Sequence, residues 1–438
     1  MSFLSVLTTG SIAAFALQLA SGFSQPIIGA ELLSGRLEPI SSSLVIAQAK
    51  SVKESTSVNA PLFIRNSYNP AILHLRYTES NGKTIDTRAD SFIDFTLIPA
   101  EGDSIGRRIE LNSSNFRKHL RGLYSSLSRR ELINASDEDS PSRELFKLLI
   151  APILPLLEEQ RITTLLISAD RGLQAIPFSA LSDGQIFFGE RFAFSLTPSL
   201  SLMEFDAPGK LVGSQLLALG ASQFDGLAPL PLVPQELEGI NVEGKKEQLI
   251  NESFTPDALL EEAADPRYSN VHVATHADFV PGGPSFSTLH SGAGPISLDQ
   301  LEKLRRSRKG VPLDLIVFSA CRTALGDRDS ELGFAGLALQ AGAKSAIGTL
   351  WYVDDVVTSA YFVQMYRFLS IGVPKAEAMQ LTRQSFIRGL IYLENDRIVG
   401  ADGIDLLTGL TPIQVRRVSN GMNHPFFWSG IQLMGTPW

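Results

Sequence analysis

Two residues in the second half of the chain, His276 and Cys321, have the types and positions that nucleophilic catalysis needs. His276 directly follows the apolar run Val271–Thr275, and Cys321 closely follows the apolar run Leu315–Ser319. A cysteine thiolate is a strong nucleophile, and a neighbouring imidazole can take up its proton and later protonate a leaving amine. The backbone N–H groups of Ala277 and Cys321 are candidates to hold the oxyanion, because that task needs donors rather than particular side chains. The pair therefore predicts amide-bond hydrolysis through a thioester, with no cofactor.

Cys321 is the one cysteine of the chain, and His276 is one of six histidines. A lone cysteine is by default a buried small hydrophobe, so the alternative is a core cysteine and a core histidine. Placement at strand ends, before polar loop-like sequence, favours the catalytic interpretation. A single cysteine excludes an intrachain disulfide and argues against a cysteine zinc site. His272 and His276 have no third ligand at a suitable spacing, so no metal is expected and His272 is interpreted as structural.

Composition narrows the class of protein. The 438 residues are 44% hydrophobic and 19% charged, which is enough apolar sequence for one large domain or two lobes. The net charge of −8 argues against a nucleic-acid partner, which would need a basic face.

Short apolar runs alternate with helical patterns from about residue 144 onward. Strands are predicted at 163–168, 216–220, 271–275, 315–319 and 345–350, and helices at 144–159, 257–263 and 297–306. Earlier, residues 71–77 and 91–97 predict a hairpin around Asn81-Gly82, followed by a helix at 114–130. The alternation predicts a three-layer αβα fold with a mostly parallel sheet. Adjacent parallel strands would bring His276 and Cys321 together at the carboxyl edge of that sheet, where open α/β sheets bind ligands.

The run Ser319-Ala320-Cys321-Arg322 resembles the caspase-type signature, with Ser319 in place of Gln. Further motifs occur in order along the chain at Gly172–Leu181, Leu230–Leu237, Val271–Ala277, Phe318–Gly326, Gly336–Ala343, Leu350–Asp355, His424–Trp428 and Gly435–Trp438. Together these segments resemble the CHAT family, a caspase-like family often found beside TPR repeats in bacteria and related to separase and the caspases. The resemblance covers roughly residues 60–438.

The resemblance implies a caspase-like fold with a divergent N-terminal lobe and a catalytic pair made of His276 and Cys321. It divides the chain into a leader and linker at 1–59, an N-terminal lobe at 60–205 and a catalytic lobe at 206–438. Arg322 stands where the family usually has Glu, and a cation there would lower the pKa of the thiol rather than abolish activity. The chain carries no TPR region. A TPR-containing or other activating protein is therefore an expected partner, besides a protein or peptide substrate.

Two acidic residues and a long excursion remain open to alternatives. By resemblance to separase-like peptidases, Asp354 or, preferably, Asp355 would line a pocket for a basic P1 side chain. The alternative is that one of them caps the helix that follows. The segment Gly389–Asn423 interrupts the family's ending and is interpreted as a surface hairpin, with a lid or partner surface as the alternative.

Two function classes fit the sequence: an active cysteine endopeptidase, or a latent or inactive caspase-like scaffold that binds a protein partner. The N-terminal run Phe3–Leu19 is apolar and no Lys or Arg precedes it. A signal peptide or membrane anchor and an ordinary N-terminal segment fit it equally. Localisation stays open, and membrane contact is expected only if the segment is an anchor.

Overall fold

A computed structural model describes most of the chain after residue 67. The described residues are 68–79, 89–131, 133, 137, 139–170, 173–197, 199, 200, 203, 215–278, 287–320, 333–351 and 354–438. The leader at 1–59 and its apolar run therefore lie outside the described residues. Within the described part, no helix combines the length and the apolar character needed to cross a membrane.

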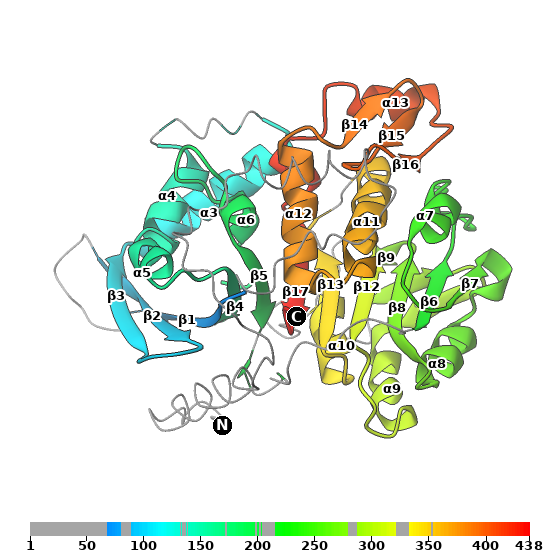
Figure 1. Ribbon diagram of the computed structural model, residues 1–438, viewed down its shortest axis with the longest axis horizontal. Coiled ribbons are helices and arrows are strands. Elements are labelled where there is room, and N and C mark those ends of the chain that lie inside the picture. Colours follow the sequence, from blue (N-terminus) through cyan, green and yellow to red (C-terminus); the bar gives the residue numbers. More distant parts are fainter. Residues whose placement is uncertain are drawn as a thin grey trace, which may run out of the picture.

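One 11-stranded sheet runs through the molecule (Figure 1). Its strands are β1 (Pro70–Glu79), β2 (Ser91–Pro99), β3 (Ile105–Leu111), β4 (Thr164–Ala169), β5 (Ala193–Thr197), β6 (Gln215–Gly220), β7 (Lys246–Ile250), β8 (Tyr268–Ala274), β12 (Leu315–Ser319), β13 (Ser345–Thr349) and β17 (Ile431–Gly435). The spatial order is β3-β2-β1-β4-β5-β17-β13-β12-β8-β6-β7. All five strands predicted from residue 163 onward are confirmed.

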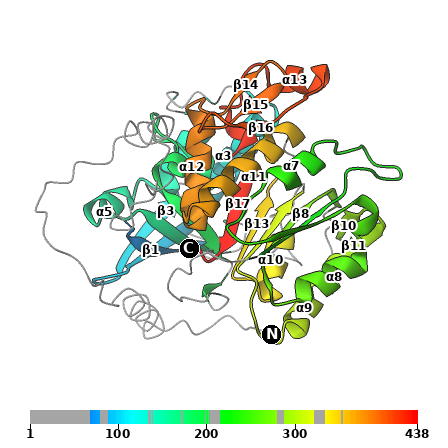
Figure 2. The same cartoon turned by 45° about the vertical axis from the view of Figure 1, so that its right-hand side comes forward.

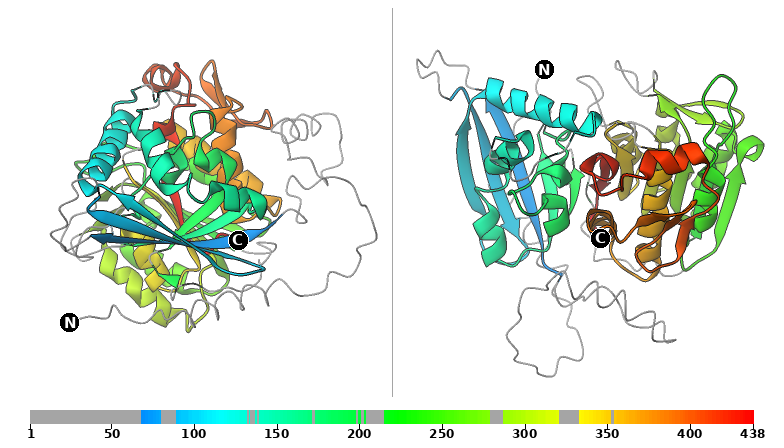
Figure 3. Two further views of the ribbon diagram at one scale, coloured as in Figure 1. Left: turned by 90° about the vertical axis from the view of Figure 1, so that its left-hand side faces the viewer. Right: turned by 90° about the horizontal axis from the view of Figure 1, so that it is seen from above.

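The two halves of the sheet meet at β17, the last strand in the chain. β17 pairs antiparallel with β13 and parallel with β5. Figure 3 shows the halves on either side of this C-terminal strand. The expected N-terminal and catalytic lobes thus share one sheet, while the boundary predicted at 205/206 lies outside the described residues and stays a prediction.

The predicted hairpin is confirmed by the antiparallel pairing of β1 with β2, in which Ala71 lies opposite Pro99. Its Asn81-Gly82 turn lies outside the described residues. The predicted helix at 114–130 is α3 (Ser113–Ser128), where the side chain of Asn112 accepts a hydrogen bond from the Asn115 N–H. Such a cap satisfies one of the free donors at a helix start.

The helix predicted over 144–159 is wrong in one respect, because the structure has two helices there. They are α4 (Pro141–Leu149) and α5 (Leu154–Glu159). Pro152 lies in the break and has no N–H to continue the helical ladder, and its ring clashes with the preceding turn.

Alternate residues of the central strands face two different helical layers. On β8, Val271 and Val273 belong to the apolar cluster under one face, and Ala274 belongs to the cluster on the other. The first face is covered by η6 (Leu298–Leu301), α8 (Pro256–Ala264), α9 (Glu302–Ser307) and α10 (Gly333–Gln340). The second is covered by α7 (Val233–Gly239), α11 (Asp355–Ser370) and α12 (Lys375–Ile387). Each buried aliphatic side chain contributes about 1.5–3 kcal/mol, and the two covered faces confirm the three-layer α/β prediction.

The excursion Gly389–Asn423 is more than the predicted hairpin. It forms a three-stranded antiparallel sheet and a short helix: β14 (Tyr392–Glu394), β15 (Arg397–Val399), β16 (Asp405–Leu407) and α13 (Pro412–Val418). Ile398, Leu407 and Val418 are buried against the α11 layer. These apolar contacts fix the segment, which lies above α11 in Figure 2, to the helical layer. The hairpin interpretation missed it because residues 412–418 have too few turns to be recognised as a helix from sequence.

Candidate active site

The strands that lead to the predicted catalytic pair are neighbours. β8 and β12 run parallel, and their register places Ala274 opposite Ser319. Beyond this pair, the backbone N–H of Thr275 donates to the Ser319 carbonyl across 3.2 Å. The prediction that these two strands end side by side is confirmed. His276 and Ala320, the described residues that follow, both line one pocket at this carboxyl edge.

This pocket, here called the edge pocket, has about 500 Å³ of empty space, a figure that includes open solvent at its mouth. It is lined by residues of the β6–α7 connection, the ends of β8, β12 and β13, and the first turns of α7 and α11: Leu230, Leu232, Val233, Glu236, Thr275, His276, Ser319, Ala320, Thr349, Asp355, Thr358 and Ser359. The mix of apolar walls and a few polar groups suits a peptide side chain.

His276 lies in the connection after β8 and is held from two sides. Its Nε2 lies 2.8 Å from the carbonyl oxygen of Ala228. Its ring packs against Phe224, with 4.7 Å between ring centroids. A carbonyl oxygen only accepts, so Nε2 carries a proton in this bond, and in a neutral imidazole Nδ1 is then the basic atom. This assignment of the tautomer comes from the hydrogen bond itself.

Cys321 and the adjacent Arg322 lie outside the described residues. Ser319 and Ala320, which come directly before Cys321 in the chain, are described and line the edge pocket. Thr349, at the end of β13, donates its hydroxyl to the Ala320 carbonyl across 2.8 Å. The chain that leads into the cysteine is thus tied to both neighbouring strands.

Ala277, the predicted oxyanion donor, begins the short strand β9 (Ala277–Asp278). β9 is the edge of a three-stranded sheet with β10 (Thr288–Ser291) and β11 (Gly294–Ser297). The His290 N–H donates to the His276 carbonyl, while Leu289 lies opposite Ala277. Hydrogen-bonded and non-bonded pairs alternate in antiparallel strands. The Ala277 N–H therefore points away from β10.

Asp354 and Asp355 have different surroundings: Asp354 is the helix cap, and the pocket role of Asp355 stays a prediction. Asp354 caps α11, its Oδ1 accepting from the Val356 N–H across 3.1 Å, and its side chain is only 3% exposed. Burial raises the pKa of Asp354, an effect that the nearby guanidinium of Arg417 opposes. Asp355 is the first residue of α11 and lines the edge pocket with His276.

Two arginines that were not predicted from sequence lie beside these acids. Arg417 of α13 places Nε 3.3 Å from Asp354 and donates through Nη2 to Asp355. Arg130 places Nη2 3.7 Å from Asp354, and its guanidinium stacks over the ring of Phe426. The only sequence signal for Arg417 was the long excursion close to the predicted site.

A buried polar network lies behind the edge pocket. Nε2 of His272 lies 2.9 Å from one carboxylate oxygen of Glu236, and the Ser359 hydroxyl donates to the other across 2.7 Å. His272 is 0% exposed and its ring packs edge-on against Phe362. The three residues join β8, α7 and α11, in agreement with the structural role predicted for His272. In the described part of the chain, no three His, Cys, Asp or Glu side chains gather as a metal site requires.

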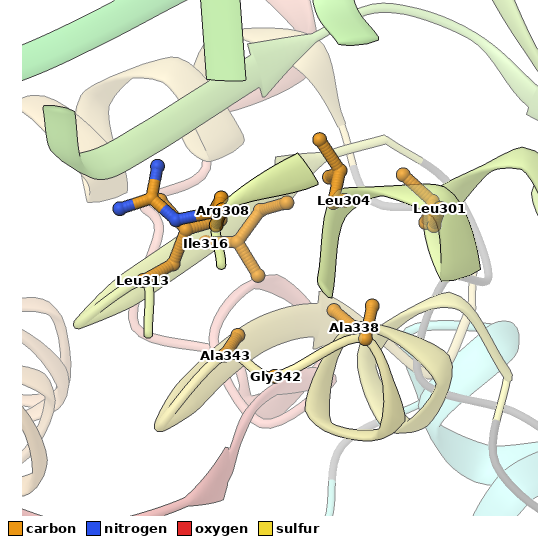
Figure 4. Close-up of a pocket in the computed structure, with 9 residues that line it drawn as sticks. Leu301, Leu304, Arg308, Leu313, Ile316, Ala338, Gly342 and Ala343 are labelled. Carbon is orange, nitrogen blue, oxygen red and sulfur yellow. The ribbon is translucent and has the colours of Figure 1, made fainter. Parts of the chain in front are cut away.

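A second pocket opens at the opposite end of β12 (Figure 4). Its walls are apolar, including Leu304, Leu313 and Ala338. The guanidinium of Arg308 beside it donates to the backbone carbonyls of Ala263 and Tyr268. The Arg308 guanidinium is thus occupied by backbone carbonyls, and the other described side chains that line the pocket are apolar.

No curated protein matches the chain. Among solved structures, the chain is similar to separase of Saccharomyces cerevisiae in complex with securin, at 10% identity and a TM-score of 0.46. That match covers 90% of this chain and 31% of the other, so this chain spans about a third of the separase chain. It is also similar to the Arg-specific cysteine proteinase gingipain R, at 11% identity and a TM-score of 0.37, covering 73% of this chain and 75% of the other.

The model of the CHAT domain matches residues 139–436. The match covers β4 to β17, with both His276 and Cys321, and starts after α3, later than the residue 60 expected from sequence. It spans about two thirds of the chain. The chain belongs to the CHAT domain family.

Proposed function

We propose that this protein is a cysteine endopeptidase in which Cys321 is the nucleophile and His276 the general base and acid. The observation that carries the proposal is the setting of His276. Its Nε2 is bound to the Ala228 carbonyl, which leaves Nδ1 as the base at the wall of an open pocket. The strand beside it ends at Ser319, two residues before the only cysteine of the chain.

In the proposed reaction, Nδ1 of His276 takes the proton from the Cys321 sulfur, and the thiolate attacks the carbonyl carbon of the scissile amide. The Ala277 and Cys321 N–H groups stabilise the oxyanion. The intermediate collapses, the C–N bond breaks, and His276 gives its proton to the leaving amine. Water then attacks the thioester as His276 removes a proton from it. The C–S bond breaks, His276 returns its proton to the Cys321 sulfur, and the product leaves with a new carboxyl terminus.

Asp355 is the proposed selector of a basic P1 side chain. Its carboxylate is 23% exposed and lines the same pocket as His276. An arginine in the pocket would bind that carboxylate with charge-assisted hydrogen bonds. Asp354, buried and committed to the helix cap, is better suited to position Asp355 than to contact substrate.

The proposal is tested by cleavage of a proteome-derived peptide library, with mapping of the new N-termini by mass spectrometry. We expect cleavage by the wild type, mainly after Arg or Lys, and none by Cys321→Ala or His276→Ala. Cleavage that survives in Cys321→Ala contradicts the mechanism.

A second arm uses an acyloxymethyl ketone probe with Arg at P1, with and without candidate activating proteins. Labelling that needs both His276 and Cys321 supports the peptidase. No labelling under any condition, together with an uncleaved library, favours the scaffold function.

A further inference from the structure

The acid that the edge pocket offers to a basic side chain already has a cation bound to it. Arg417 comes from α13, at the end of the excursion Gly389–Asn423, and donates to the Asp355 carboxylate. In Figure 1, α13 lies at the same end of the molecule as the start of α11. The pairing joins residues 62 positions apart in sequence, so it exists only because the excursion docks on α11.

The acidic and basic side chains around Asp355 are equal in number. Asp354 and Asp355 supply two carboxylates, and Arg417 and Arg130 supply two guanidiniums. A basic P1 side chain that approaches Asp355 therefore meets a neutralised acid. It gains a strong bond only if one of the arginines moves away, because Asp354 is buried and fixed by the helix cap.

Of the two arginines, Arg417 is the one that can move away from the acids. Its side chain is 38% exposed and that of its partner Asp355 is 23% exposed, and a partly exposed ion pair is weak and screened by salt. The helix that carries it is anchored independently through buried Val418 and a capping box between Thr411 and Gln414. Arg130, by contrast, is held by two cation–π contacts, because its guanidinium lies over the rings of Phe426 and Phe427. A change of Arg417 rotamer into solvent would free Asp355 without unfolding α13.

We propose that Arg417 is an intramolecular competitor for the basic P1 side chain and so determines the P1 selectivity of the site. The proposal rests on the proposed peptidase function and on Asp355 as its selector. The substrate must displace the Arg417 guanidinium from Asp355. Removal of the Arg417 charge therefore tightens binding of basic P1 residues and leaves uncharged P1 residues unaffected.

The test compares Arg417→Gln with Arg416→Gln, a matched control because Arg416 is the exposed neighbour on the same helix. Fluorogenic peptides carry either Arg at P1 or its uncharged isostere citrulline. In Arg417→Gln we expect KM for the Arg peptide to fall about threefold to tenfold, as expected for loss of a partly exposed ion pair. The kcat and all citrulline values stay constant, and Arg416→Gln behaves as the wild type. A parallel change for both peptides, or a higher KM for the Arg peptide, overturns the proposal.

Binding to Cys321→Ala separates failure of this inference from failure of the peptidase function. Fluorescence anisotropy of labelled, uncleaved Arg and citrulline peptides reads the pocket without chemistry. Tighter binding of the Arg peptide alone in Cys321→Ala/Arg417→Gln supports the competitor role, even for a protein that cleaves nothing. Equal binding of both peptides by both proteins overturns it. Adding Asp355→Asn is expected to abolish the gain, and urea unfolding midpoints confirm that the variants are folded.

Discussion

The carbonyl oxygen of Ala228 lies 2.8 Å from Nε2 of His276, which leaves Nδ1 as the basic atom of the neutral imidazole. Ala228 lies in the connection between β6 and α7, far from His276 in sequence. The same connection supplies Phe224, whose ring packs against the imidazole. The orientation of the His276 ring thus depends on the connection between β6 and α7.

Replacement of Phe224 by Ala is expected to reduce kcat about tenfold with little change in KM, because the imidazole gains freedom to rotate away from its reactive position. Phe224→Leu, which keeps an apolar wall, should retain most activity. Steady-state kinetics on one peptide substrate measure both. A loss confined to KM would contradict the orienting role and place Phe224 in substrate binding instead.

The Glu236 network is expected to control stability. Glu236→Ala leaves the Ser359 hydroxyl and Nε2 of His272 without their partner in the core. We expect a loss of about 3 kcal/mol in the free energy of unfolding. Glu238→Ala, an exposed change on the same helix, should stay within about 0.5 kcal/mol of the wild type. Urea denaturation measures both, and equal losses would show that Glu236 has no special role.

Two substitutions of Asp354 separate the contribution of its helix cap to stability from the contribution of its charge. Asp354→Asn keeps an oxygen that can accept a hydrogen bond from the Val356 N–H. It removes a carboxyl group whose pKa is raised by burial. Asp354→Ala removes the cap as well and is expected to lose about 1 kcal/mol more than the Asn variant. Thermal unfolding at neutral pH compares the two. Equal stability of the Ala and Asn variants would rule out the cap as the source of stabilisation.

Glu377 of α12 predicts a pH dependence of stability. Burial raises its pKa from 4.5 to about 7, against the hydrogen bond donated by Thr164. Since the folded state holds the proton more tightly than the unfolded state, this group costs stability as the pH rises from about 4.5 to about 7. Glu377→Gln removes that cost. The variant should match the wild type near pH 4 and be more stable above pH 7, by up to about 3 kcal/mol. Parallel stability curves across this range would contradict the prediction.

Sequence alone predicted the parts of the fold that burial dictates. The apolar runs of β8 and β12 had to be covered strands, and their shared carboxyl edge followed from the parallel order. The position of β17 between β5 and β13 could not be predicted, because it depends on pairing between residues far apart in the chain. The break at Pro152 shows a local signal overlooked within an otherwise helical pattern.

At the site, side chains with distinctive chemistry could be selected from sequence, and His276 does line a pocket with Asp355. The Ala228 carbonyl could not be selected from sequence, because every residue has a carbonyl group and only the fold decides which one faces the imidazole. Arg417 was equally hidden, since an arginine in a short helix becomes significant only when that helix docks beside the acids. These contacts come from packing rather than from motif.

The most direct test of the central claim is the pH dependence of Cys321 alkylation. Because the chain has one cysteine, intact-protein mass spectrometry after iodoacetamide treatment reads that thiol alone. If His276 takes its proton, the wild-type thiol should react rapidly well below pH 8, and His276→Gln should shift the profile toward the ordinary thiol pKa of about 8.5. Superimposable profiles for the wild type and His276→Gln would show that the imidazole does not serve the sulfur, and would contradict the catalytic pair.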